Sequence, residues 1–493
     1  MDRLSPLPDD ILAKILSSID NSPDAVRTCL LSRSWRPLWK LLPELRFPFF
    51  PEQASMFRDA LDRHQVPLRH LQVEGHGQGA LPKSLAIWLP AAARRVSGCF
   101  ALRNNAAPIL EDLDDERAED QTATIELPCF EQATSILICL GLLGSLAMPP
   151  ADADGAGGVF SRLTDLCLER VWFHHPSELG DAVSSARCPC LQTLKLRNTP
   201  GLEVLAIDST SLLKMNLEEV IDLRELTVEA PELKEITVVD CFVFSLMPSE
   251  SIVVTVTAPE LVFLDWKDSM ESQRRILAQL SQFPRLCSLG SLLIFVYGTD
   301  DAFVPYNTYF LEFLQHIQFL ENLTLTLVYV QDIENYQYLM EDMRMLPKVT
   351  TLHLIVASSG HCYGACLFHI LRVCTGIRKL VLDLHATPEE PLTCPPGCNC
   401  ENQSNWQSEK LLLVGLEEIE IQRFGRTTHD IDFVERLFGW ATPLKKATII
   451  FDILVREGVA KELCRMFGLF SRPEIHIEFR YHNNKKMLYA PED

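Results

Sequence analysis

The sequence predicts a mixed α/β fold in which a small helical head precedes a curved array of strand-bearing repeats that ends in a cap. Two patterns support this prediction. Apolar residues recur at helical spacing in the first fifty residues, and a short leucine signature recurs from about residue 160 onward. The length of 493 residues exceeds one small domain, and a repeat array accommodates such a length in one architecture.

The head is predicted to contain three short amphipathic helices. The first follows Pro8 and has aliphatic side chains on one face at positions 11, 12, 15, 16 and 19. The second has apolar residues at positions 26, 29, 30 and 31, and the third at positions 35, 38, 39 and 42. Three helices in so few residues bury too little surface for independent stability, so their apolar faces need the downstream chain, a partner, or both.

Three strings in the head show a family resemblance. They are Leu7-Pro-Asp-Asp-Ile-Leu12, Leu30-Leu-Ser-Arg33 and Trp35-Arg-Pro-Leu-Trp39. Together they resemble the plant F-box over residues 1–47, with one departure at Ser34, where relatives commonly have a second arginine. The resemblance implies a three-helix F-box that docks onto a Skp-family adaptor and, through it, onto a cullin in a ubiquitin ligase.

The apolar residues of the head are the expected adaptor contacts, with Arg33 and Arg36 as charges at the rim. The set comprises Leu4, Leu7, Pro8, Ile11, Leu12, Ile15, Leu16, Val26, Leu30, Leu31, Arg33, Trp35 and Trp39. The same residues could instead form the core of a small helical domain. The sequence does not separate those that pack internally from those that face a partner.

Residues 48–130 are predicted to form a linking region that leads into the repeats. Within it, residues 85–96 have the pattern of an amphipathic helix, and residues 111–116 are an acidic run typical of a loop. The apolar stretch at residues 136–148 is interrupted by glycine and is too short to cross a bilayer. We therefore expect it to be buried core.

The signature Leu-x-x-Leu-x-Leu, with other aliphatic residues admitted, recurs through residues 131–385 and beyond. Its copies start at Leu163, Leu191, Leu202, Leu212, Leu223, Leu233, Leu261, Leu320, Val349, Ile377, Leu416 and Leu444. Many steps are 28 or 29 residues, which suits a leucine-rich repeat that pairs one strand with one helix, as at residues 361–374. Between 191 and 233 the steps alternate between 11 and 10 residues, which suits a narrower coil with a strand on each side. The pattern predicts a curved leucine-rich-repeat solenoid.

The interval from Ile377 to Leu416 is 39 residues, longer than the other steps. The extra residues fall in a Cys-rich loop insertion at residues 386–410, and insertions in repeat arrays emerge as surface loops. Together with residues 411–493, the pattern resembles the terminal region of grass F-box/leucine-rich-repeat proteins of the FBD type. We expect this region to provide the last repeats and a cap, because the final coil would otherwise expose its apolar face.

The cysteines of the insertion, Cys394, Cys398 and Cys400, are weak candidates for a metal site. A zinc site is conceivable because His361, Cys362, Cys366 and His369 precede them by a short distance. The paired Cys-x-x-Cys spacing of standard zinc sites is missing from the insertion, so reduced thiols are favoured and no cofactor is predicted. A nucleophilic Cys-His pair, for example Cys362 with His369, is a weaker alternative.

Composition and motifs argue against several functions. The chain has 66 Asp and Glu against 45 Lys and Arg, a net charge of -21, which argues against nucleic-acid or membrane partners. Phosphate-loop, nucleophile-elbow, zinc-helix and dinucleotide signatures are missing from the sequence, so we predict no catalytic residue and no enzyme activity. Sixteen cysteines and a polar opening without secretory character predict the cytoplasm, the nucleus, or both.

We therefore predict the substrate-recognition subunit of a Skp–cullin–F-box ligase, whose repeats bind an unknown target protein. The expected target contacts lie at variable positions of the repeats and comprise Lys195, Arg197, Glu225, Thr227, Lys234, Glu235, Thr237, Asp265, Thr324, His353 and Asp383. Most of these residues are expected to be ordinary solvated strand positions. The alternative is a leucine-rich-repeat scaffold that binds proteins without joining a ligase.

Overall fold

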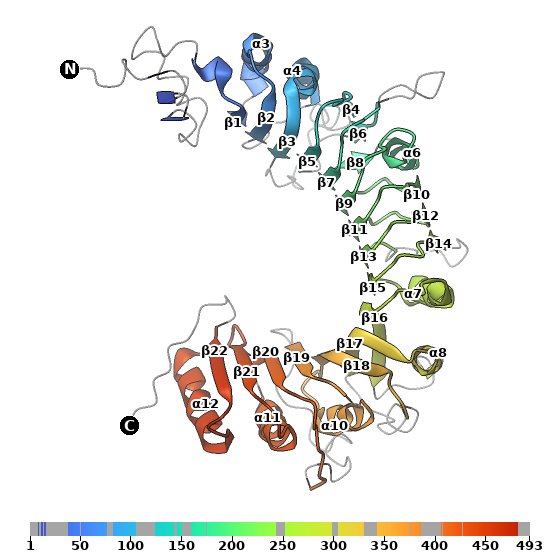
Figure 1. Cartoon of the computed structure of the whole chain (residues 1–493), viewed down its shortest axis with the longest axis vertical. Helices are drawn as coiled ribbons and strands as arrows, with labels where there is room; N and C mark the ends of the chain where they lie inside the picture. The colour runs from blue at the N-terminus through green and yellow to red at the C-terminus, as the bar shows by residue number, and fades with distance from the viewer. Residues whose placement is uncertain are drawn as a thin grey trace, which may run out of the picture. The chain divides into compact units, whose positions relative to one another are not determined.

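The computed structural model of the chain is shown in Figure 1. It describes residues 8, 11–12, 14–15, 38–49, 51–75, 82–104, 124–141, 145–149, 159–173, 175–242, 252–297, 304–329, 343–374, 376–385, 406, 408–425 and 427–481. Within these ranges, no helix combines the length and apolar character that a membrane crossing requires.

The chain divides into two compact units. The N-terminal unit comprises Met1–Leu261 and Lys267–Arg285, and the C-terminal unit comprises Val262–Trp266 and Leu286–Asp493. This division does not correspond to the domain boundaries expected from the sequence, which stay predictions.

The N-terminal unit is built on a parallel sheet with strand order β1-β2-β3-β5-β7-β9-β11-β13. These strands are β1 (Glu44–Phe49), β2 (Leu68–Gly75), β3 (Val96–Asn104), β5 (Ser135–Cys139), β7 (Asp165–Glu169), β9 (Thr193–Arg197), β11 (Lys214–Glu218) and β13 (Glu235–Val239). Two smaller sheets contain β4 (Thr124–Glu126), β6 (Ser145–Ala147), β8 (Trp172–Phe173), and β10 (Val204–Asp208), β12 (Glu225–Glu229), β14 (Val253–Thr257). The helices are η2 (Leu38–Leu41), η3 (Pro51–Gln53), α3 (Ala54–Arg63), α4 (Pro82–Arg95), α6 (Glu178–Val183), α7 (Met270–Gln279) and η4 (Leu280–Gln282).

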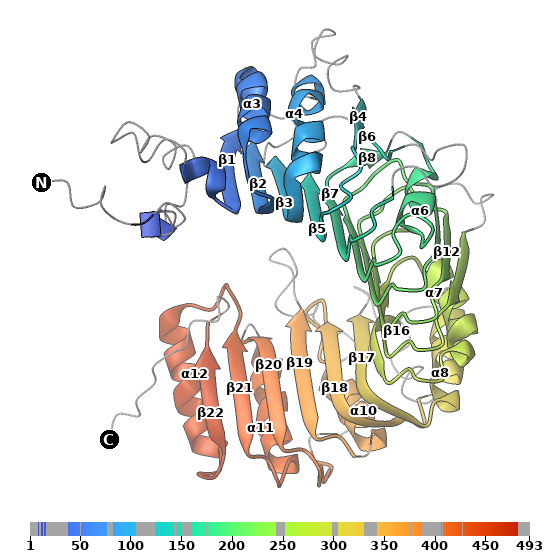
Figure 2. The same cartoon turned by 45° about the horizontal axis from the view of Figure 1, so that its top comes forward.

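The C-terminal unit contains a second run of strands in the order β15-β16-β17-β18-β19-β20-β21-β22. These are β15 (Phe263–Lys267), β16 (Ser288–Tyr297), β17 (Phe319–Tyr329), β18 (Lys348–Ala357), β19 (Lys379–His385), β20 (Glu418–Phe424), β21 (Lys446–Phe451) and β22 (His476–Arg480). Its helices are α8 (Val304–His316), α10 (Gly364–Val373), α11 (Thr428–Trp440) and α12 (Glu457–Phe470). Figure 2 shows α10, α11 and α12 on one side of the strands.

The leucine signature locates the strands. Ten strands begin two residues after the start of a predicted copy, for example β9 after Leu191 and β19 after Ile377, and β17 and β18 begin one residue before theirs. The last two apolar positions of each copy alternate with polar ones, so they point to the buried side of the strand. The predicted strand positions are therefore confirmed, as are the helices expected at residues 85–96 and 361–374.

Between residues 191 and 233, the chain has the two alternating sets of strands that the 10- and 11-residue steps predict. Successive strands alternate between the large sheet and the three-stranded sheet, so β9 is followed by β10 and then by β11. Each strand pairs in register with the next-but-one strand, Lys214 with Thr193 on one side and with Glu235 on the other. The space between the two sheets is filled by fully buried aliphatic side chains such as Leu194 and Leu205. Each coil is thus stabilised by burial of its own leucines and those of its neighbours.

Four strands of the N-terminal unit end at a left-handed residue. Arg170, Asn198, Glu219 and Asp240 have φ between 49° and 54° and follow β7, β9, β11 and β13 directly. Each donates its backbone N–H to a carbonyl of the following coil, as Asn198 does to Glu218 at 2.8 Å. The left-handed turn bends the chain out of the strand without losing this hydrogen bond.

The large sheet begins earlier than the leucine signature suggested. Strands β1, β2 and β3 precede residue 131, where the sequence placed the start of the repeats. Strand β2 contains Leu68-x-x-Leu71-x-Val73, a copy of the signature that went unrecognised. Backbone hydrogen bonds from Gln65 to Lys40 and from Arg69 to Pro43 connect the end of the predicted head to β2 and the residues just before it.

An aromatic core closes the C-terminal end of the array. Phe424, Phe451 and Phe467 are buried, and Phe467 lies 5.5 Å from the ring of Phe424 and 5.5 Å from the ring of Phe479. Helices α11 and α12 also meet here, through Phe438 and Phe467 at 5.7 Å. Aromatic side chains bury large areas, so this cluster covers apolar surface that the last strands would otherwise expose.

Replacing either of two glutamines of α7 by methionine is predicted to change the free energy of unfolding, in opposite directions for the two residues. Gln273 is fully buried, and its amide oxygen and nitrogen have no hydrogen-bond partner among the described residues. We expect Gln273→Met to raise the free energy of unfolding by about 1–2 kcal/mol, because it removes an unsatisfied buried amide at similar volume. Urea denaturation of the full chain measures the change.

Gln279 is the matched control on the same helix. Its amide donates to the carbonyl of Val254 at 2.5 Å and accepts from the N–H of Val256 at 3.0 Å. The substitution Gln279→Met leaves both backbone groups unsatisfied and should lower stability by about 1–3 kcal/mol. Equal effects of the two substitutions would contradict this account of the buried amides.

Candidate protein-binding surface

The strands β17–β22 have one face turned away from α10, α11 and α12, which we call the open face. Alternate residues of each strand point to it, and in the parallel ladder they align in rows. One row runs through Thr351, Lys379, Glu418, Lys446 and His476. The residues between these positions, such as Leu380 and Ile419, are fully buried under the helices. The open face therefore presents polar side chains on a rigid framework.

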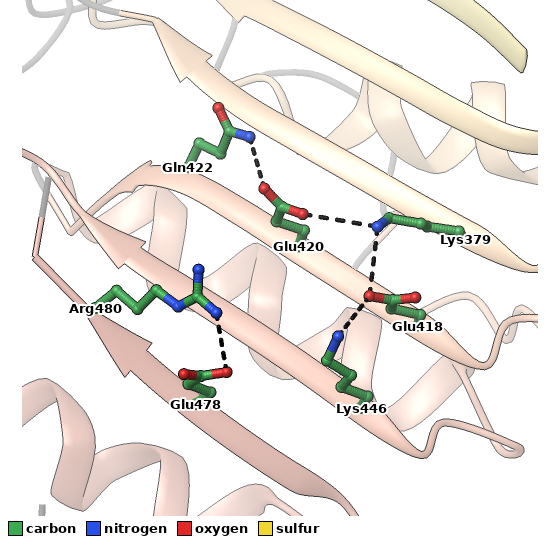
Figure 3. A network of polar contacts seen from close by, with 7 residues as sticks. All are labelled: Lys379, Glu418, Glu420, Gln422, Lys446, Glu478 and Arg480. Atoms are coloured by element: carbon green, nitrogen blue, oxygen red, sulfur yellow. Dashed lines mark hydrogen bonds and ion pairs between the residues drawn. The ribbon is translucent and has the colours of Figure 1, made fainter. Parts of the chain in front are cut away.

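Figure 3 shows the ion pairs at the centre of the open face. The ammonium of Lys379 lies 3.3 Å from a carboxylate oxygen of Glu418 and 3.7 Å from one of Glu420. Lys446 reaches the same oxygen of Glu418 at 3.0 Å, so this carboxylate lies between two lysines. Gln422 donates to Glu420 at 2.7 Å, and Arg480 contacts Glu478 at 3.2 Å. The contacts of Lys379 and Lys446 join β19, β20 and β21 through side chains of both signs, whereas the pair of Arg480 and Glu478 lies within β22.

These pairs organise the surface more than they stabilise the fold. The hydrogen bond from Lys446, together with the charge of Lys379, lowers the pKa of Glu418. The side chains remain partly exposed, and exposed ion pairs contribute about 0–1 kcal/mol each. Their main physical effect is to hold long charged side chains in defined positions at a surface where a second protein can meet them.

A second polar group lies beside this network. The carboxylate of Asp383 is 7% exposed and accepts a hydrogen bond from the guanidinium of Arg423. His353 lies on the neighbouring strand, β18. Burial lowers the pKa of its imidazole. The negative charges of Asp383 and Glu420 act to raise this pKa, and the positive charge of Arg423 lowers it further. Three of its buried atoms, Nε2 of His353, Oδ1 of Asp383 and Nε of Arg423, have no hydrogen-bond partner in the described part of the chain.

A bulge in β20 turns Arg423 toward the open face. The register between β20 and β21 shifts between Ile421 and Phe424, and Arg423 has a left-handed φ of 57°. Strict alternation would place Arg423 on the buried side with Ile419 and Ile421. The bulge instead buries Phe424 and leaves the guanidinium beside Asp383. A left-handed arginine costs conformational energy, and such positions gather at functional surfaces.

The large sheet of the N-terminal unit has a comparable polar side. Lys195 and Arg197 lie on β9, and both are exposed. Arg197 contacts Glu218 at 3.4 Å, and Lys214 contacts Glu235 at 2.8 Å, in each case across neighbouring strands. Two of the predicted target contacts therefore share a face with charged neighbours in register.

The structure does not gather all the predicted target contacts. Glu225 lies on β12 in the three-stranded sheet, and Lys234 lies in the turn before β13. Asp265 accepts a hydrogen bond from the N–H of Ser291 at 2.6 Å, so its carboxylate already supports the irregular start of β16. His353 belongs to the open face. Thr227 shares β12 with Glu225, whereas Glu235, Thr237, Thr324 and Asp383 lie on strands of the two main runs.

Part of the predicted adaptor-binding set lies within the described residues. Pro8 and Ile11 are exposed, Ile15 is half-buried and Leu12 is fully buried. Trp39 packs edge-on against His64 at 6.3 Å, so its ring contacts the segment that follows α3. The other members, Leu4, Leu7, Leu16, Val26, Leu30, Leu31, Arg33 and Trp35, lie outside the described residues. The three-helix head stays a prediction.

The candidate metal ligands Cys394, Cys398 and Cys400 lie outside the described residues. In the ranges that the structure describes, no three His, Cys, Asp or Glu side chains form a group that could hold a metal ion. The nearby residues have other contacts. Cys366 is fully buried, and a ring nitrogen of His369 lies 2.7 Å from the carbonyl of Met343.

A packed tryptophan, Trp406, lies near the end of the insertion. The ring of Trp406 lies 6.0 Å from Phe433 and 6.1 Å from Trp440 of α11. It also rests against Gly364 at the start of α10, where an added Cβ would come within 2.2 Å of the indole. Aromatic packing therefore attaches Trp406 to both helices.

The sequence interpretation missed the charged residues at the centre of the open face. Lys379, Glu418, Glu420 and Lys446 follow a simple signal, because they occupy the polar positions of alternating segments such as Glu418-Ile-Glu-Ile421. Arg423 had no such signal, because the bulge breaks the alternation there.

The parallel strands, the leucine signature and the helices on one side define a mixed α/β repeat protein with an open polar face. No family model matches the chain. It is similar to a putative F-box/FBD/LRR-repeat protein of Arabidopsis thaliana, 25% identical over 351 residues, which cover 69% of this chain and 74% of the relative. A second such Arabidopsis protein is 30% identical over 44% of this chain and 48% of its own length, and a third is 26% identical over 55% and 52%.

These comparisons confirm the resemblance seen in the sequence: the chain is similar to plant F-box/FBD/LRR-repeat proteins. The chain spans about half the length of the second and third of these relatives.

The lowered pKa of His353 predicts a dependence of stability on pH. The folded chain binds the imidazole proton less tightly than the unfolded chain, whose histidine pKa is near 6.5. Stability should therefore fall as the pH drops from about 7.5 to about 5.5, and His353→Gln should reduce that fall. Urea denaturation at both pH values measures it. His385→Gln, at the exposed end of β19, is the control, and a loss as large in His353→Gln as in the unmodified chain would contradict the prediction.

Proposed function

We propose that this chain is the substrate-recognition subunit of a Skp–cullin–F-box ubiquitin ligase. Its head docks the Skp-family adaptor, and the open strand faces bind a target protein. The ligase acts by proximity: the adaptor and cullin bring the ubiquitin-transferring subunits to a target held by this chain, which raises their effective concentration. We place this activity in the cytoplasm, the nucleus, or both.

Two observations support the adaptor-docking role. The head contains the three strings that resemble the plant F-box, and the similar Arabidopsis proteins have F-box in their names. Within the described part of the head, Pro8 and Ile11 leave apolar surface exposed beside the buried Leu12. An exposed aliphatic side chain next to a fixed one is the arrangement that a partner groove can accept.

The observation that carries the target-binding role is the network of Lys379, Glu418, Glu420 and Lys446 on the open face. It stands on a parallel ladder whose other side is buried, so its side chains are displayed in register. The network adds little to the stability of the fold. Because it presents charges of both signs, it favours a partner protein with a complementary pattern of charges over a partner whose surface has one sign of charge.

The adaptor role is tested with Ile11→Asp in the full chain. Ile11 is 37% exposed, so the substitution removes an apolar contact without opening the core, and we expect at least a tenfold loss of Skp-family adaptor binding, about 1.4 kcal/mol. Surface plasmon resonance with purified adaptor measures it. Ile453→Asp, at a 64% exposed residue of the C-terminal unit, should bind as the unmodified chain does.

If the unmodified chain binds no Skp-family adaptor, the ligase proposal fails. The ligase-independent scaffold would then be the better account of the repeats. Equal loss of binding by Ile11→Asp and Ile453→Asp would also contradict the docking role of the head.

The target role is tested with the double substitution Lys379→Glu, Lys446→Glu. Reversing both charges around Glu418 should abolish the ubiquitylation of proteins that depends on this chain and leave adaptor binding unchanged. Quantitative proteomics of ubiquitylated peptides after proteasome inhibition measures the loss. The control is Lys445→Glu, Lys461→Glu, at exposed lysines outside the network that pair with Glu417 and Glu457. Loss of the same proteins in the control would contradict the assignment to the open face.

A further inference from the structure

A thiol and an imidazole that are not part of the ion-pair network lie in contact in the C-terminal unit. The sulfur of Cys362 is 3.2 Å from Nδ1 and 3.3 Å from Nε2 of His429. Cys362 lies two residues before α10, and His429 lies in the first turn of α11. The sequence suggested His369 as a partner for this cysteine. The fold instead pairs Cys362 with a histidine 67 residues away.

A neighbouring hydrogen bond positions the pair. The residues next in sequence, Tyr363 and Asp430, form a buried contact in which the phenol donates to the carboxylate at 2.9 Å. The carboxylate of Asp430 also accepts from the hydroxyl of Thr427 at 2.6 Å and from its N–H at 3.1 Å, in the capping box of α11. Both backbones are therefore held one residue away from the thiol–imidazole contact.

The surroundings of Cys362 differ from those of the buried cysteines in the same unit. Burial raises the pKa of Cys366 and of Cys374 to about 12 and that of Cys464 to about 11, so these thiols stay protonated at neutral pH. Cys362 is only half-buried, lies beside an imidazole and precedes a helix, whose N-terminus favours a negative charge. These are the conditions under which a cysteine reacts as a thiolate.

We propose that Cys362 and His429 form a reactive thiol site that is oxidised by hydrogen peroxide. His429 takes the proton of the thiol, and the thiolate sulfur attacks one peroxide oxygen. A sulfur–oxygen bond forms and the oxygen–oxygen bond breaks, which oxidises the sulfur by two electrons to a sulfenic acid. The departing hydroxide takes the proton from the imidazolium and leaves as water. This site does not depend on the proposed ligase role.

The test uses the reduced full chain and iodoacetamide as the probe. Mass spectrometry follows the labelling rate of each cysteine, with Cys190, an exposed thiol, as the internal reference. We expect Cys362 to react at least about tenfold faster than Cys190 near neutral pH. In a parallel reaction with hydrogen peroxide, a dimedone trap should mark Cys362 as the first sulfenic acid. A rate at Cys362 no higher than that at Cys190 overturns the proposal without any variant.

The role of the imidazole is tested with His429→Gln. We expect labelling of Cys362 to slow by about tenfold near neutral pH and its pH profile to move to higher pH, because the base that removes the thiol proton is lost. His369→Gln, a histidine of α10 that contacts the carbonyl of Met343, is the control and should leave both unchanged. Circular dichroism checks that each variant is folded. An unchanged rate and pH profile in His429→Gln would overturn the pairing.

Discussion

The parallel register of the strands is the constraint on which the other features depend. Because each strand pairs in step with its neighbour, leucines stack on leucines on one side and polar side chains form rows on the other. A shift of one residue would exchange the two sides and expose the whole apolar set. Burial of the aliphatic residues therefore sets the register, and the register in turn fixes the spacing of Lys379, Glu418 and Lys446.

Much of the fold could be predicted because the leucine signature combines two periods in a short motif. Its last two apolar positions specify the buried side of a strand, and the distance between copies specifies whether a helix or a second strand returns the chain. The first strands were harder to predict. Strand β2 carries an unrecognised copy at Leu68, and β3 begins with a register shift after Val96. In these strands, pairing with the neighbouring strand determines the structure more than the local sequence pattern does.

The candidate surface was predictable only in part, for a related reason. His353 and Asp383 occupy ordinary outward positions, so alternation identified both. Arg423 reaches Asp383 only because a bulge adds one residue and a left-handed backbone turns it outward. Neither the residue type of Arg423 nor its position in the alternating pattern predicts such a bulge. The contact between Cys362 and His429 was equally hidden, because it depends on two helix starts that the fold brings together across 67 residues.

Packing of Trp406 fixes the position of the chain near the end of the insertion. Strand β19 ends at His385, and the indole of Trp406 packs against Gly364, Phe433 and Trp440. The chain is therefore held in place on both sides of residues 386–405. A foreign peptide, such as an epitope or a fluorophore-binding tag, could replace that interval while both anchors are kept. Loop-closure entropy changes slowly with length, so the length of the grafted peptide would affect stability little, and the graft would provide a labelling site on the intact protein.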